Sequence, residues 1–157
     1  MREIHLTDKE ATYLIQIIKQ VFKKYKVDVK PGNSGEILLK SHDEHHNFVL
    51  NYYTPKRRND KMSIHIREKD TNLSLVRVNI DPSGFHNNSD GTTIKGNRIL
   101  IFSSEEFYKK NDGFTHVKAY NLPNDFSNPG DLEQVFLDFL GYTNVKKEGK
   151  IDFAGLI

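Results

Sequence analysis

A polar segment, residues 84–98, concentrates side chains that could do chemistry. Its reactive groups are an imidazole, an amide and a carboxylate, those of His86, Asn88 and Asp90. The connection is longer than an ordinary hairpin needs, and long polar loops in compact domains often carry function. We therefore expect a functional site in this segment.

Arg77 lies on the preceding strand-like run, and Arg98 ends the segment and begins the next run. An imidazole can move a proton near neutral pH, and guanidinium groups bind phosphate oxygens in a fork. If the chain is an enzyme, we expect metal-independent cleavage of RNA by His86, Arg77 and Arg98. The structural alternative is that Asn88 and Asp90 serve turn formation, which is common for their residue types.

A second candidate surface is the basic turn that follows two tyrosines, within residues 52–61. Bases stack on aromatic rings while lysine and arginine contact phosphates, which is how single strands are often held. The same composition is also typical of a solvent-facing hairpin turn. The predicted binding residues of the whole chain are Tyr52, Lys56, Arg57, Arg58, His86, Asn88 and Asp90.

A third cluster, residues 42–46, holds three histidines and two carboxylates. Imidazole suits zinc, but closed metal sites draw on distant elements, and ligands on one tight turn cannot easily surround an ion. We therefore expect a solvated hairpin tip, no metal and no cofactor, although the sequence leaves open whether His42, His45 and His46 bind an ion. The absence of cysteine excludes disulfides and thiolate sites.

Length and composition favour one domain spanning residues 1–157, since a chain of this length can build a single core. The net charge of +2 is too small to require a nucleic-acid partner. A macromolecular partner can therefore be a protein or a nucleic acid. The charged N-terminus and the lack of a long apolar run predict a cytoplasmic protein without a membrane segment. The oligomeric state stays open.

Apolar periodicity predicts the elements that position these groups. A capping box of Thr7 and Glu10 opens an amphipathic helix over 7–26, and a second helix begins at Asn128 and ends at Gly141. Strands are expected at 36–41, 47–54, 61–68, 73–80, 98–102 and 115–122, with a helical turn at 103–110. These elements predict an α+β fold, an antiparallel sheet of about five to six strands packed against the two helices.

One face of this sheet should be polar. In the run 61–68, His65 and Arg67 alternate with apolar residues, as in a half-buried strand. In the run 73–80 the apolar parity changes near residue 75, which predicts a bulge that turns Arg77 and Asn79 to the wet side. We expect these four side chains to gather on that face, together with Arg98.

Several motifs together resemble an uncharacterised family of small proteins from phages and mobile elements of low-GC Gram-positive bacteria. The segments that carry the resemblance are Leu75 to Asp81, His86 to Gly91, Lys118 to Pro123 and Asp138 to Leu140. The resemblance implies an accessory role in a mobile element, such as defence or toxin–antitoxin conflict, and it supplies no catalytic residues.

Two functions follow from these observations. We favour a small accessory protein that binds another macromolecule, as an inhibitor or regulator of a host defence or nucleic-acid-processing system. The alternative is a ribonuclease-like toxin. Binding is favoured because each proposed catalytic group also has a structural explanation.

Overall fold

The computed structural model describes residues 3–155, which form three helices and twelve strands. The helices are α1 (Asp8–Gln16), α2 (Ser104–Lys110) and α3 (Leu132–Tyr142). The strands are β1 (Lys19–Val21), β2 (Tyr25–Val27), β3 (Ser34–Ser41), β4 (Asn47–Tyr53), β5 (Met62–Glu68), β6 (Ser74–Ile80), β7 (Phe85–Asn87), β8 (Thr93–Lys95), β9 (Arg98–Phe102), β10 (Val117–Asn121), β11 (Val145–Lys146) and β12 (Ile151–Phe153).

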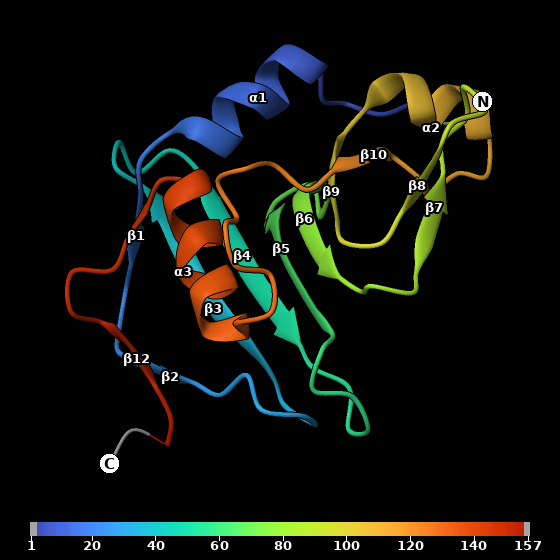
Figure 1. Cartoon of the computed structure of the whole chain (residues 1–157). Helices are drawn as coiled ribbons and strands as arrows, with labels where there is room; N and C mark the ends of the chain where they lie inside the picture. Colours follow the sequence, from blue (N-terminus) through green and yellow to red (C-terminus); the bar gives the residue numbers. More distant parts are fainter. Residues whose placement is uncertain (1–2, 156–157) are drawn as a thin grey trace.

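Eight of these strands form one sheet in the order β10-β9-β6-β5-β4-β3-β1-β11 (Figure 1). Neighbouring strands are antiparallel except β1 and β11, which run parallel. The α+β class is therefore confirmed. The prediction of five to six antiparallel strands was wrong, because the short strands β1 and β11 extend the sheet and make it mixed.

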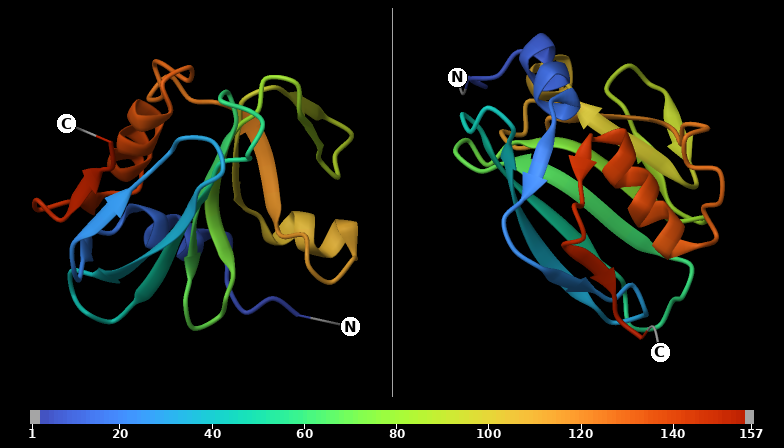
Figure 2. Two further views of the ribbon diagram at one scale, coloured as in Figure 1. Left: turned by 90° about the horizontal axis from the view of Figure 1, so that it is seen from below. Right: turned by 90° about the vertical axis from the view of Figure 1, so that its left-hand side faces the viewer.

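Two further strand pairs lie at opposite ends of the sheet (Figure 2). The β7–β8 hairpin stands beside β10 together with α2. The parallel pair of β2 and β12 lies at the other end, near β1. Residues 84–98, expected to form a loop, are thus largely ordered as a hairpin.

The N-terminal helix is shorter than predicted. Its capping box is present, since the Glu10 backbone N–H donates to Thr7 Oγ1 at 3.0 Å. The helix ends at Gln16, however, and Ile17 is already extended, with ψ 151°. Branched residues such as Ile17 favour extended backbone. The pairing of β1 with β3 and β11 then outweighs the helical spacing that predicted residues 7–26.

Helix α3 covers one face of the sheet and supplies much of the core. Phe136 and Phe139 are fully buried, and the ring of Tyr52 meets that of Phe136 edge to face at 5.6 Å. The N-cap of α3 is Asp131, three residues after the predicted cap Asn128. The Asp131 side chain accepts a hydrogen bond from the Gln134 backbone N–H. Gly141 lies inside the helix, although glycine after an apolar stripe suggested its end.

The ends of two helices meet at one buried lysine. Lys19 is fully buried, and its Nζ donates to three carbonyl oxygens, those of Ile15 at 2.7 Å, Ile17 at 3.1 Å and Thr143 at 2.8 Å. These carbonyls belong to the C-terminal ends of α1 and α3, where a positive charge is favourable. Burial lowers the pKa of Lys19 to about 7, while the three acceptors favour its charged form.

Candidate functional site

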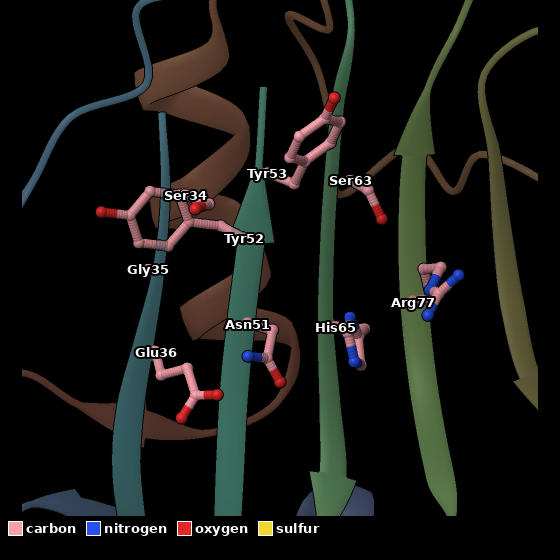
Figure 3. Close-up of a pocket in the computed structure, with 9 residues that line it drawn as sticks. All are labelled: Ser34, Gly35, Glu36, Asn51, Tyr52, Tyr53, Ser63, His65 and Arg77. Atoms are coloured by element: carbon pink, nitrogen blue, oxygen red, sulfur yellow. The ribbon is translucent and has the colours of Figure 1, made fainter. Parts of the chain in front are cut away.

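The face of the sheet opposite α3 carries two rows of polar side chains. Side chains of successive strand residues point to opposite faces, and the register aligns those on one face across neighbouring strands. The first row, from β3 to β6, is Glu36, Asn51, His65 and Arg77 (Figure 3). The second row, from β3 to β9, is Ser34, Tyr53, Ser63, Asn79 and Arg98.

A bulge brings the β6 residues into these rows. The register between β5 and β6 shifts between Ile66 and Arg67, and both Leu75 and Val76 are buried. Beyond the shift, Arg77 lies opposite His65 on the polar face. The bulge predicted near residue 75 is confirmed, as is the gathering of the polar side chains on this face.

Three adjoining hollows on this surface all have Tyr53 in their walls, and we call them together the Tyr53 trough. The first hollow, about 450 Å³, is lined by residues of β3 to β6 that include His65 and Arg77. The second, about 390 Å³, is also lined by Arg77 and extends to Arg58. The third, about 400 Å³, reaches Lys56 and Arg57, residues of the basic turn after β4.

Tyr53 presents its aromatic ring to this trough far more openly than the predicted Tyr52, which also lines the first hollow. Tyr53 is 56% exposed, whereas Tyr52 is 7% exposed and packs towards α3. Figure 3 shows the two side chains on the strand they share, β4. The run Phe48-Val49-Leu50 in β4 is buried throughout and breaks the alternation, so sequence spacing did not indicate which tyrosine faces the solvent.

The cations around the trough fall into two groups. Arg58 is held by Asp60 through two hydrogen bonds of 2.8 Å, and Lys61 lies 3.3 Å from Asp81. No carboxylate within residues 3–155 pairs with the other three cations of the trough, Lys56, Arg57 and Arg77. The trough therefore has positive charge available for an anionic partner.

His65 is a neutral group at the centre of the first polar row. Burial, and then the charges of Arg77 and Arg67, lower the pKa of His65 to about 4. Arg67 itself is engaged, because it donates to Asn72 at 2.9 Å and to Asn51 at 3.4 Å. At neutral pH, His65 can thus donate and accept a hydrogen bond without adding charge.

Asn88, a predicted binding residue, is occupied within the protein. It is 5% exposed, its Nδ2 donates to the Ala119 carbonyl at 3.0 Å, and its Oδ1 accepts from the Ala119 N–H at 2.9 Å. This amide satisfies backbone groups on the outer edge of β10, as a further strand would. Asp90 accepts from the Thr92 N–H at 2.9 Å and pairs with Lys118 at 3.1 Å. These interactions, led by the Thr92 hydrogen bonds, hold the pKa of Asp90 well below its usual range.

The hollows of the trough include one of the three predicted catalytic residues. Arg77 lines the first two hollows of the trough, and neither His86 nor Arg98 lines them. Arg98 is 7% exposed, and its Nη1 donates to the Gly96 carbonyl at 2.8 Å. Burial, and then the charges of Lys110 and Arg98, lower the pKa of His86. Its Nε2 is buried and has no hydrogen-bond partner within residues 3–155.

The histidine-rich turn, residues 42–46, joins β3 and β4. Asp43 accepts from the Ser41 hydroxyl at 2.5 Å and from the His45 N–H at 3.0 Å, and His46 lies 3.9 Å from Glu68. In the described part of the chain, no group of three or more histidine, aspartate and glutamate side chains is placed to hold a metal ion. Nor does any helix described there have the length and apolar character needed to cross a membrane.

The fold and the trough define an α+β protein built on a mixed sheet, one face of which is open and polar. The sequence pattern of a family of unknown function (DUF6978) matches residues 6–145, so the chain belongs to this family. The comparisons with curated proteins and with solved structures gave no match. The resemblance to an uncharacterised family is thereby confirmed, while the expected mobile-element origin and Gram-positive hosts stay predictions.

Proposed function

We propose that this chain is a binding protein that holds single-stranded RNA on the Tyr53 trough. The observation that supports this proposal is that an exposed aromatic ring and unpaired cations lie on the same surface. Tyr53 borders all three hollows, Lys56 and Arg57 line one of them, and Arg77 lines the other two. Proteins that bind single strands combine stacking rings with cations that follow the backbone.

A single strand fits this surface better than a duplex does. A ring such as that of Tyr53, 56% exposed, can stack only on a base that is itself unstacked. The net charge of +2 gives little long-range attraction, so the unpaired local cations must bind the phosphates. We therefore expect modest affinity that falls with added salt.

The proposed role in the cell is that of an accessory regulator. The resemblance noted from the sequence supports a mobile-element protein that acts on a nucleic-acid-processing or defence system, and the cytoplasmic location stays a prediction. A regulator of this kind needs affinity and shape but no reaction. The internal hydrogen bonds and ion pair of Asn88 and Asp90 are consistent with a structural role for the hairpin.

The proposal is tested by fluorescence anisotropy with a labelled oligouridine RNA. Tyr53→Ala should weaken binding about 10-fold, since stacking of one base contributes roughly 1–3 kcal/mol. Replacing both Lys56 and Arg57 with alanine should lower the salt slope by about 1.4, or 0.7 for each phosphate that is no longer neutralised. The matched control replaces two exposed lysines of the β11 region, Lys146 and Lys147, and should leave binding unchanged.

Absence of RNA binding at about 10⁻⁴ M protein and low salt would refute the proposal, because even non-specific complexes have dissociation constants of about 10⁻⁴ M or lower. Equal losses of affinity in the control and trough variants would also refute it. A host protein that binds the trough in place of RNA would replace the proposed partner.

The ribonuclease hypothesis stays a prediction, and the same RNA tests it. It requires cleavage without added metal and a loss of about 100-fold in rate for His86→Ala, as expected for a general acid or base. Intact RNA after prolonged incubation with the wild-type protein favours binding alone.

A further inference from the structure

Arg77 holds a partly buried positive charge without a partner. Its Nε is buried and makes no hydrogen bond within residues 3–155. The acidic side chains that share its hollows are engaged elsewhere, since Asp81 lies 3.3 Å from Lys61 and Glu36 lies 3.9 Å from Arg67. Buried charges in proteins are normally paired, so an external anion is the natural partner for this guanidinium.

Uncharged hydrogen-bonding groups surround this guanidinium. His65 lies directly opposite Arg77 in the register, and Ser63 lies opposite Asn79 one row away. The β-carbons of such opposed residues are about 5 Å apart, so long side chains reach one another. The side chains of His65, Ser63 and Asn79 make no hydrogen bond to another residue in the described chain, and Asn79 Oδ1 is buried without a partner. These groups can therefore turn towards a ligand.

We infer that Arg77, with His65, Ser63 and Asn79, forms a subsite for one phosphate group of the bound strand. The inference rests on the proposed function and names what part of the RNA this end of the trough recognises. A guanidinium presents parallel N–H donors that match two phosphate oxygens. The hydroxyl, imidazole and amide can supply further donors to the same two oxygens without a second charge.

The ring of Tyr53 lies next to this subsite. Tyr53 is opposite Ser63 in the register, so the ring and Arg77 stand on the two strands that flank β5. These two strands lie two strand spacings apart, or about 10 Å, and the two residues belong to adjacent rows. A base stacked on Tyr53 would place its strand over the first hollow, with the phosphate group at Arg77 (Figure 3).

The experiment is an NMR titration of isotope-labelled protein with inorganic phosphate, with acetate as the carboxylate control. Phosphate should produce saturable shifts at the Arg77 Nε–H and the His65 ring, and acetate should produce weaker ones. Arg77→Gln should remove the phosphate-induced shift of the His65 ring and weaken RNA binding at least about 10-fold, since a charge-assisted hydrogen bond contributes roughly 1.5–3 kcal/mol. The control Lys69→Gln removes one positive charge from an exposed residue on the turn after β5 and should retain the shifts at Arg77 and His65.

The outcomes separate the two proposals. RNA binding that Arg77→Gln leaves unchanged, without phosphate shifts at Arg77, overturns the subsite and leaves the proposed function intact. Phosphate shifts without RNA binding support the anion site and overturn the proposed function. Scattered shifts that do not saturate overturn the subsite as well. If Arg77→Gln does not fold, Arg77→Lys replaces it as the test. This variant keeps the positive charge but loses the two parallel N–H donors of the guanidinium, and it should show the same weakened RNA binding.

Discussion

Lys19→Met is the most direct test of how the two ends of the chain are joined. Methionine keeps a similar length and an apolar stem but removes the ammonium group. The carbonyls of Ile15, Ile17 and Thr143 then lose their donor, and two of these hydrogen bonds are buried while that of Ile17 is partly buried.

The expected decrease is about 3 kcal/mol of unfolding free energy. Each buried acceptor left without a donor costs roughly 1–3 kcal/mol. We take the lower end of that range for each of the three carbonyls, because methionine avoids the desolvation of a buried charge. The substitution also removes the cation–π interaction of Lys19 Nζ with the Phe48 ring, whose centroid is 5.1 Å away.

Urea unfolding followed by circular dichroism measures this decrease directly. For a chain of this size, about 3 kcal/mol also corresponds to a fall in melting temperature of roughly 6–12 °C. The control Lys24→Met changes an exposed lysine and should lie within about 0.5 kcal/mol of the wild type. A Lys19→Met protein as stable as this control would show that the three hydrogen bonds do not join the helix ends.

Three further substitutions test other parts of the structure. Because the pKa of His65 is about 4 in the fold and roughly 6.5 in an unfolded chain, only the unfolded state binds this proton between those pH values. The free energy of unfolding should therefore decrease as the pH falls through that window, by up to about 1.4 kcal/mol per pH unit. In the His65→Gln variant, urea midpoints measured from pH 7 to pH 4 should depend less on pH than those of the wild type. Asn88→Ala should lower the free energy of unfolding in urea by about 2 kcal/mol, because the Ala119 backbone groups lose their partners. It should also expose the β10 edge, so that the variant self-associates in size-exclusion chromatography with light scattering. Asn87→Ala, on the same hairpin, should show neither effect. Thr7→Ala should cost about 1 kcal/mol in the same unfolding assay through loss of the N-cap, and an unchanged midpoint would contradict the capping box.

Sequence patterns predicted the centre of the sheet well. The alternation around Ile64 and Ile66 located β5, and the change of parity near Leu75 located the bulge. The strand at Arg98–Phe102 was predicted with its observed bounds, and the segment before Lys110 is helical, as expected. In these regions local periodicity and burial agree, because each strand has one buried face.

The errors arose where tertiary pairing decides the local structure. Residues 19–27 carry apolar side chains at helical spacing, but their backbone pairs with β3, β11 and β12. Strands β7 and β8 have three residues each, mostly exposed and with one apolar residue apiece, so no apolar pattern indicated the hairpin. For the candidate site, the sequence identified Arg77 and the basic turn, while Tyr53 required knowledge of the register.

The pairing of β1 with β11 has a consequence for how this protein folds during synthesis. Lys19 and Gln20 are aligned with Val145 and Lys146, so strands from the two ends of the chain lie side by side. During synthesis on the ribosome, this pairing can form only after the residues up to Lys146 have emerged. Pairing between distant segments slows folding, and an unpaired edge is prone to aggregation in the meantime. We therefore expect truncations before residue 145 to yield chains that are degraded or aggregate.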